Sequence, residues 1–332
     1  MKNNAAADLN FFICGGAGFI GSNLTKYLYR NFPNCTVTVT VYDNLSSGSL
    51  DFFDSSLLEK ISFINSDIKD LDILTDAMNS QDIVFLLAAN PDIALAQKFP
   101  DIDFWEGTYL THNTLEAMRK AEVSKIFYTS GSGVYGEKNN IEFSEDYGPC
   151  VPISTYGASK LASESLIASY CHMYDFRARV LRFANVVGPN QTHGVGYDFL
   201  RNLNSNPKSL KILGDGTQTK SYIHINDVLQ AINKMIDHLL DDSNKYSYDV
   251  YNVASGDYIT VNQIADLTCE VLNLSPGDVK YDFTGGSRGW KGDVPKIKFN
   301  CNKIKQLGWE PKLNSQEAIK MSLIAMLGEI NK

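Results

Sequence analysis

Apolar residues in the first half of the chain form short continuous runs, separated by longer stretches with helical periodicity. The runs are rich in β-branched and aromatic residues, which is typical of buried strands. We expect strands over residues 10–14, 36–42, 61–65, 83–88, 125–129 and 179–183. The intervening periodicity predicts helices over residues 19–29, 71–78, 102–121 and 158–173. Strands that are apolar on both faces and alternate with helices predict an α/β fold, with a doubly wound parallel sheet.

This regular alternation ends after Gly188, and Gly, Asn and Pro become frequent between Gly188 and Gly216. A strand and a helix are then expected over 222–240, and another helix over 261–272. No flexible linker separates the two regions. The pattern therefore predicts a smaller C-terminal region whose segments interleave with the first.

Composition and charge narrow the classes of protein. The 332 residues are 44% hydrophobic, which is enough for one large domain or two modest ones. The net charge of −8 argues against a general nucleic-acid or anionic-membrane surface. The apolar runs are far shorter than the roughly 18–20 residues of a membrane helix. The start, residues 1–10, is polar and has no apolar core, so we interpret it as a short frayed leader and not as a signal peptide. We therefore expect a cytoplasmic protein with no nucleic-acid or membrane partner.

The cysteines give no sign of a metal site. They lie far apart, without a CxxC pair and without clustering with the five histidines. The pattern predicts reduced and mostly buried thiols at Cys14, Cys35, Cys150, Cys171, Cys269 and Cys301.

Three glycines, Gly15, Gly18 and Gly21, stand between the first predicted strand and the first predicted helix. Gly15 would form the tight turn, Gly18 would let the backbone approach a pyrophosphate, and Gly21 would allow close helix packing. Asp43 ends the second strand, 22 residues after Gly21, and a carboxylate there accepts hydrogen bonds from the ribose hydroxyls of NAD. The pattern predicts a Rossmann-type site for NAD rather than NADP.

Two further features belong to this prediction. Asp67 and Ile68 follow the third strand, where they would cover the adenine; the alternative is that Asp67 only caps the next helix. Tyr156 and Lys160 lie four residues apart at a helix start, so both project from one face. A close ammonium favours the phenolate form of a tyrosine, which makes Tyr156 a candidate acid/base for a sugar hydroxyl. Lys160 would lower the pKa of Tyr156 and donate a hydrogen bond to the nicotinamide ribose.

Together these motifs resemble the extended short-chain dehydrogenase/reductases, in particular the NAD-dependent nucleotide-sugar epimerase/dehydratase family. The resemblance extends over nearly the whole chain. Its motifs are GGAGFIGSNL from Gly15, YDNLSSG from Tyr42, LLAANPDI from Leu86, SGSGVYGE from Ser130, YGASKLASE from Tyr156, LRFANVVGP from Leu181, GDGTQTKSYIHINDV from Gly214 and RGWKGDVP from Arg288. On this basis we expect residues 1–187 to form the NAD-binding domain, with 222–256 returning to it. Residues 188–221 and 257–332 would form the substrate-binding domain.

The resemblance also implies roles for single residues. The further residues that it assigns to the cofactor are Phe19, Ile20, Asn44, Ser47, Gly48, Leu87, Ala88 and Ala89. Those that it assigns to the nucleotide-sugar substrate, UDP- or GDP-linked, are Asn185, Gln218, Lys220, Tyr222, Arg288 and Asp293. Asn185 would meet the diphosphate, Arg288 would bind a phosphate, and Lys220 stands where the family usually has arginine. The family commonly forms homodimers through two helices, here 102–121 and 158–173.

Two positions depart from the family pattern. The usual catalytic serine or threonine falls on Gly131, so the hydroxyl would come from Ser130, Ser132 or water. A common asparagine falls on Gly107. Ser132 and Gly133 also stand where the family's 4,6-dehydratases have an Asp-Glu pair, which disfavours dehydration. The prediction is an NAD-dependent 4-epimerase that oxidises sugar carbon 4 transiently; the alternatives are a carbon-4 dehydrogenase and a non-catalytic NAD-binding regulator.

Two loop residues complete the candidates. His193, in the QTHGVG loop, would contact the sugar or remain a solvated loop residue. Glu137 directly follows the VYG motif and is interpreted as a solvated loop charge.

Overall fold

The computed structural model describes residues 8–32, 36–138, 141–241, 243, 247–289, 292–294 and 296–331. Most of the predicted leader, and Cys35, lie outside these ranges. Within them, no helix is both long and apolar enough to cross a bilayer. The cysteines in these ranges are free thiols, and all except the half-buried Cys150 are buried, as predicted.

Seven strands form the central sheet, in the order β12-β7-β5-β4-β1-β2-β3. Neighbouring strands from β3 to β5 pair in parallel. The bounds are β1 Leu9–Cys14, β2 Val37–Asp43, β3 Ser62–Asn65, β4 Ile83–Leu86, β5 Lys125–Gly131, β7 Arg177–Phe183 and β12 Tyr248–Val253. From β1, the chain adds β2 and β3 on one side and then β4, β5, β7 and β12 on the other. This is the doubly wound arrangement that the sequence predicted. The predicted strands are all present, and β12 adds an edge strand that the apolar pattern did not indicate.

The helices between these strands are α1 Phe19–Asn31, α3 Leu71–Ala77, α4 Tyr109–Lys120, α5 Thr155–Met173 and α7 Ile225–Leu240. The helix predicted over 102–121 differs from the structure. A turn of π-helix, η3 (Phe104–Thr108), precedes α4. Such a turn inserts an extra residue into the helical repeat, which hydrophobic periodicity does not reveal.

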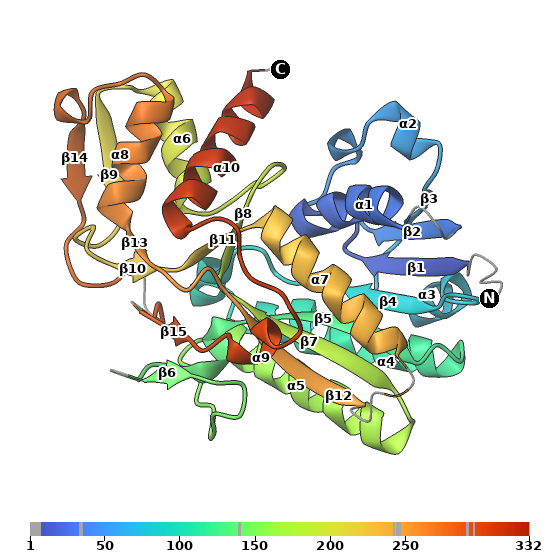
Figure 1. Cartoon of the computed structure of the whole chain (residues 1–332). Helices are drawn as coiled ribbons and strands as arrows, with labels where there is room; N and C mark the ends of the chain where they lie inside the picture. The colour runs from blue at the N-terminus through green and yellow to red at the C-terminus, as the bar shows by residue number, and fades with distance from the viewer. Residues whose placement is uncertain are drawn as a thin grey trace. The chain divides into compact units, whose positions relative to one another are not determined.

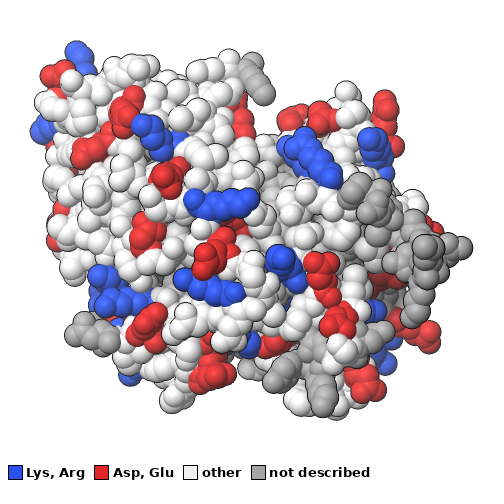
Figure 2. All heavy atoms as spheres, in the orientation of Figure 1, with Lys and Arg blue, Asp and Glu red and all other residues white. Residues whose placement is uncertain are grey.

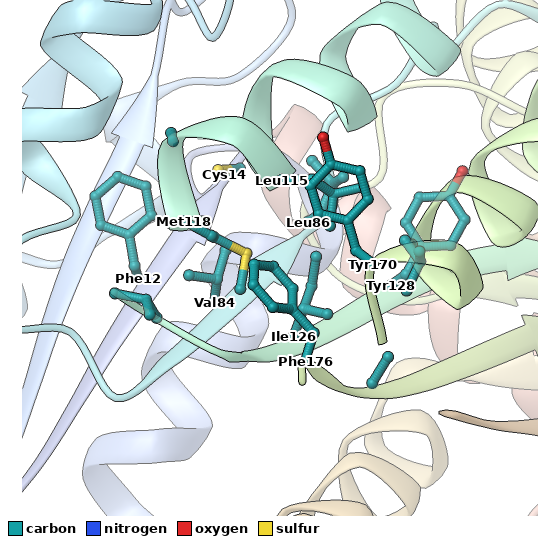
Figure 3. Close-up of a cluster of buried hydrophobic side chains, with 14 of the residues drawn as sticks. Phe12, Cys14, Val84, Leu86, Leu115, Met118, Ile126, Tyr128, Tyr170 and Phe176 are labelled. Atoms are coloured by element: carbon teal, nitrogen blue, oxygen red, sulfur yellow. The ribbon is translucent and has the colours of Figure 1, made fainter. Parts of the chain in front are cut away.

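Two compact units make up the chain. Unit 1 contains residues 1–130, 159–181 and 235–250, and unit 2 contains 131–158, 182–234 and 251–332. The core of unit 1 is a cluster that includes Phe12 and Val84 from the sheet, Met118 from α4 and Tyr170 from α5. Figure 3 shows these side chains converging between helix and sheet. The domain boundaries drawn from the sequence stay a prediction, because compactness does not say which residues bind which ligand.

Unit 2 has its own apolar cluster, which includes Leu200, Ile264 and Leu323. These residues come from the helices α6 (Val195–Ser205), α8 (Val261–Val271) and α10 (Ser315–Ile330). Figure 1 shows α6 and α8 beside the two-stranded pair β9 (Ser209–Ile212) and β14 (Lys280–Phe283), with α10 packed against these two helices. The other strands of this unit are β6 Glu142–Phe143, β8 Asn185–Val187, β10 Thr219–Lys220, β11 Tyr222–His224, β13 Ile259–Thr260 and β15 Lys298–Phe299.

Short helical turns complete the chain: η1 Leu50–Phe52, α2 Ser55–Leu58, η2 Ile93–Gln97, η4 Ser132–Tyr135, η5 Pro276–Asp278 and α9 Asn302–Lys305. Basic and acidic side chains are interspersed on the face drawn in Figure 2. The net charge of the chain is therefore not gathered into one acidic patch on that face.

Candidate active site

The turn between β1 and α1 has the geometry that its glycines predict. Gly15 has a φ of +77°, and a Cβ on Gly21 would lie 2.4 Å from the Gly15 carbonyl oxygen. A side chain at either position is therefore excluded. A Cβ on Gly18 would meet only that same oxygen, at 3.3 Å. No side chain caps α1 at Gly18, which leaves the N–H groups of its first turn, at Phe19 and Ile20, available to an anion.

Asp43 connects this turn to the loop that follows β2. Its Oδ2 accepts a hydrogen bond from the Ala17 N–H at 2.9 Å, and its Oδ1 accepts one from the Leu45 N–H at 2.8 Å. Burial raises the pKa of the Asp43 carboxyl above its ordinary value, because its effect is larger than the opposite effect of these two hydrogen bonds. The loop also touches the turn elsewhere, because a Cβ on Gly48 would lie 2.8 Å from the Ala17 carbonyl carbon. Ser47, beside it, is exposed.

The residues expected at the adenine lie in the loop after β3, which is hydrogen-bonded to the loop after β2. The Asn44 amide donates to Asp67 Oδ2 at 3.0 Å, and Asp67 Oδ1 accepts from the Lys69 N–H at 2.8 Å. The N-cap of α3 is Asp70, not Asp67, so the alternative of a simple cap at Asp67 is wrong. Ile68 is buried. The role of Asp67 and Ile68 at the adenine stays a prediction.

The loop after β4 packs directly on the glycine turn. The N–H groups of Leu87 and Ala88 both donate to the Cys14 carbonyl, at 3.0 and 3.2 Å. Leu87, Ala88 and Ala89 are half-buried. The expected cofactor residues of the three loops that follow β1, β2 and β4 thus lie in one unit, at the ends of neighbouring strands, where ligands of doubly wound sheets bind.

Tyr156 lies in the first turn of α5, and Lys160 lies one turn further along. Lys160 is buried, and its Nζ donates to the Thr129 carbonyl at 2.7 Å. Burial lowers the pKa of Lys160 to about 8, although the charges of Glu164 and Asp103 act in the opposite direction. Tyr156 is half-buried. The helix therefore presents a phenol and a desolvated ammonium on one face.

Of the candidate hydroxyls, Ser130 is engaged elsewhere. Its Oγ donates to Glu164 Oε1 at 2.5 Å, in a buried environment. Ser132 begins the short turn η4 and is half-buried. Gly131 between them is extended, and a Cβ there would meet only the Phe183 carbonyl oxygen, at 3.9 Å. Ser132 is the better placed of the two candidates, because its hydroxyl is not buried against a carboxylate.

Gly107 is enclosed more tightly. A Cβ on this residue would lie 2.2 Å from Ser159 Oγ, which itself donates to the Asp103 carbonyl at 2.6 Å. Ser159 Oγ also lies 3.0 Å from Thr108 Oγ1. The hydroxyl of Ser159 therefore fills the space that a side chain at 107 would need.

Each basic residue expected at the substrate diphosphate has a carboxylate partner. Arg288 Nη2 donates to both carboxylate oxygens of Glu137, at 2.8 and 2.9 Å. Lys220 Nζ donates to Asp293 Oδ1 at 2.5 Å. Arg288 Nη1 also donates to the Asp293 carbonyl at 2.9 Å. The interpretation of Glu137 as a solvated loop charge is wrong: a bond between residues 137 and 288 cannot be read from local sequence.

The remaining substrate candidates lie in unit 2 as well. The Asn185 amide donates to the Ser221 carbonyl at 3.1 Å, and His193 is exposed. Gln218 is buried and donates to the Leu213 carbonyl, while its Oε1 has no partner. Tyr222 belongs to the apolar cluster of this unit. Unit 2 thus holds every residue expected at the substrate, and unit 1 holds every residue expected at the cofactor except Tyr156.

Comparison with known proteins identifies the family. The model of the NAD-dependent epimerase/dehydratase family matches residues 11–254. The chain belongs to this family. It is therefore an NAD-dependent enzyme, and the resemblance seen in the sequence is confirmed.

Solved and curated members of the epimerase/dehydratase family are similar over nearly their whole length. A crystal structure of UDP-galactose 4-epimerase is 33% identical, with a TM-score of 0.84 over 97% of this chain and all of that chain. The UDP-glucose 4-epimerase of Thermus thermophilus, solved with NAD, is 27% identical, with a TM-score of 0.81 over 96% of this chain and 99% of that one. The UDP-glucose 4-epimerase of Halalkalibacterium halodurans is 28% identical over 92% of both chains.

The residues of the turn fit the family's cofactor. The uncapped start of α1 can bind the pyrophosphate, and Gly18 leaves room for its approach. Asp43 is bonded to the same turn through the Ala17 N–H, and its role at the ribose stays a prediction. Sequence reasoning missed Glu164 and Asp103, which surround Lys160. The spacing Tyr156, Lys160, Glu164 places all three on one helix face and could have indicated Glu164.

Proposed function

We propose that the protein is an NAD-dependent nucleotide-sugar 4-epimerase. The observation that supports this most directly is the buried Lys160 one turn from Tyr156 on α5, in a chain whose β1–α1 turn fits NAD. The likeness to solved 4-epimerases over nearly the whole chain supports the same reaction.

Tyr156 acts as the acid/base. It takes the proton of the sugar hydroxyl at carbon 4 as that carbon is oxidised to a ketone, and returns it when the carbon is reduced on its other face. Bound NAD supplies the reversible hydride acceptor for this step. The Lys160 ammonium stabilises the phenolate, and Ser132 donates a hydrogen bond to the sugar oxygen. Lys160 keeps its position because the Thr129 carbonyl accepts one of its protons.

The substrate is a nucleoside diphosphate sugar, UDP- or GDP-linked. Arg288, Lys220 and the Asn185 amide bind the diphosphate, and Asp293, Gln218, Tyr222 and His193 complete the site. The support is the clustering of two cations with Asp293: both Lys220 and Arg288 donate to this residue. An arginine fork and an ammonium suit the oxygens of a diphosphate.

Tyr156→Phe tests the assignment. We expect it to lower kcat by about 10²- to 10⁴-fold, because the proton acceptor is lost, with NAD retained. The assay follows a panel of UDP-, GDP- and dTDP-sugars by NMR. Tyr174→Phe, just beyond α5, makes the same chemical change and should leave kcat unaltered. Wild-type protein that interconverts none of these sugars would exclude the proposed function.

A carbon-4 dehydrogenase is the second candidate. It is favoured by Gly131 and Gly107, which stand where the family usually has side chains that serve the full cycle. Such an enzyme releases the 4-keto sugar and accumulates NADH. Absorbance at the NADH band rising with turnover would select it, whereas an inverted alcohol with NAD fully recovered would select the epimerase.

We further propose a cytoplasmic homodimer. Phe104 and Trp105 on η3 are half exposed, at 50% and 45%, and lie directly before α4, the helix that the family commonly uses to pair subunits. Free thiols suit a reducing compartment. Sedimentation velocity should give a dimer for the wild type and a monomer for Trp105→Asp.

A further inference from the structure

Two consecutive residues at the end of β5 are each bound by a charged side chain of α5. The Thr129 carbonyl accepts from Lys160 Nζ at 2.7 Å, and the Ser130 hydroxyl donates to Glu164 Oε1 at 2.5 Å. Lys160 and Glu164 are one helical turn apart, so they lie on the same helix face. All four residues are at least nine-tenths buried. This arrangement attaches α5 to the strand at two points.

A buried carboxylate is costly unless it is hydrogen-bonded and paired with a cation. Glu164 meets both conditions, through the Ser130 hydroxyl and through the charge of Lys160. A buried ammonium is costly for the same reason. Lys160 loses hydration on burial, and a nearby negative charge compensates part of that loss in free energy.

Other described groups also lie near Lys160. Asp103 contributes a second negative charge, but its Oδ1 accepts from the Asn90 amide at 2.9 Å. From β5, the Tyr128 ring lies under the ammonium, with its centroid 4.9 Å from Nζ. Tyr156 precedes Lys160 by one turn on α5. Glu164 is the carboxylate on the same helix face as Lys160, joined to the strand residue next to the one that Lys160 binds.

We propose that Glu164 is a positioning residue that keeps the Lys160 ammonium charged and fixed on the Thr129 carbonyl, while holding Ser130 at the end of β5. The inference concerns the site of the proposed function and rests on it. It also gives Ser130 a role other than the catalytic hydroxyl. Glu164 itself takes no proton from the substrate.

The test is the titration of Lys160 in Glu164→Gln, measured by NMR on full-length protein with ¹⁵N-labelled lysine side chains. Lys160→Met identifies the signal. We expect the midpoint to fall by about one pH unit or more, because the negative charge that favours the ammonium is removed. The pH at which kcat begins to fall on the basic side of its pH profile should also decrease, while KM changes less than about twofold.

Two further variants make the result decisive. Glu270→Gln removes a carboxylate from an exposed ion pair with Lys320 and should leave the Lys160 midpoint unchanged. Glu164→Asp keeps the charge but shortens its reach, so its midpoint should lie between those of wild type and Glu164→Gln. If Glu164→Gln does not fold, the Asp variant decides alone. A Lys160 midpoint equal to that of wild type would overturn the inference, whereas inactivity of wild type toward all nucleotide sugars would overturn the proposed function instead.

Discussion

The two glycines that depart from the family pattern differ in the space around them. At Gly107, an added Cβ collides with Ser159 Oγ. At Gly131, the backbone is extended and the nearest atom is a carbonyl oxygen at 3.9 Å. A side chain at 107 would thus have to displace the Ser159 hydroxyl from the Asp103 carbonyl, whereas the space at 131 is open.

Gly131→Ser should therefore fold normally and restore the hydroxyl that the family has at this place. We expect kcat for 4-epimerisation to rise several-fold, since a serine at 131 supplies a donor to the sugar oxygen in addition to Ser132. Steady-state kinetics on the best nucleotide sugar measures this. Gly131→Ala adds the Cβ without the hydroxyl and is the matched control; an equal gain in both variants would mean that the hydroxyl is not responsible.

The Arg288–Glu137 pair gives a second prediction for a single residue. In the proposed substrate site, a diphosphate would compete with the Glu137 carboxylate for the same arginine fork, so removing the charge of Glu137 should favour the ligand. A half-exposed ion pair is worth about 0.2–1 kcal/mol, so Glu137→Gln should lower the Kd for UDP or GDP by up to about fivefold. Isothermal titration calorimetry provides the number. Asp282→Asn, which removes the partner of Lys280 in an exposed pair, should change nothing.

At the scale of elements, the β1–α1 turn contains glycines that its packing requires and one, Gly18, that we predict to be needed for binding NAD. Gly21→Ala should destabilise the apoprotein by about 1–3 kcal/mol, because its Cβ meets the Gly15 carbonyl at 2.4 Å. Gly18→Ala needs only a small shift and should weaken NAD binding with little loss of stability. Urea unfolding and NAD titration of both variants distinguish the two effects. Equal loss of stability in both would show that Gly18 is also a packing position.

Local patterns predicted the sheet well because every strand of the sheet except β12 is a short apolar run followed by a turn signal. The glycine turn and the Tyr156–Lys160 spacing were equally local. The edge strand β12, Tyr248–Val253, was not predicted because its polar residues interrupt the apolar run. The Arg288–Glu137 and Ser130–Glu164 contacts were missed for another reason: the two residues of each pair lie far apart in the sequence. The helical spacing could have indicated Glu164 as a neighbour of Lys160, but not as the partner of Ser130.

At the scale of the whole molecule, the buried Lys160 makes stability depend on pH. The unfolded chain keeps this proton up to about pH 10.5, whereas the folded chain releases it near pH 8. Between these values the unfolded state binds more protons, so the contribution of Lys160 to the free energy of unfolding rises with pH. Below pH 8, the burial of the charged ammonium lowers the free energy of unfolding by its full amount. This penalty decreases by about 3 kcal/mol between pH 8 and pH 10.5.

Chemical unfolding of wild type and Lys160→Met between pH 7 and 10.5 measures this contribution. The difference in unfolding free energy should move in favour of wild type as the pH rises, since the variant has no proton to lose. A difference that stays constant over this range would show that Lys160 is not desolvated in the folded protein.

The two apolar clusters, one in each unit, have no side chain in common. A substitution that reshapes a loop over the cluster of unit 2 thus leaves no cavity among the side chains around Phe12 and Val84. If unit 2 binds the sugar as we propose, the recognised sugar can change through many small steps in this unit, each with a local effect on stability. The glycine turn, Asp43 and Lys160 lie in unit 1 and would be inherited unchanged through such a series, whereas Tyr156 lies in unit 2 and would have to be retained.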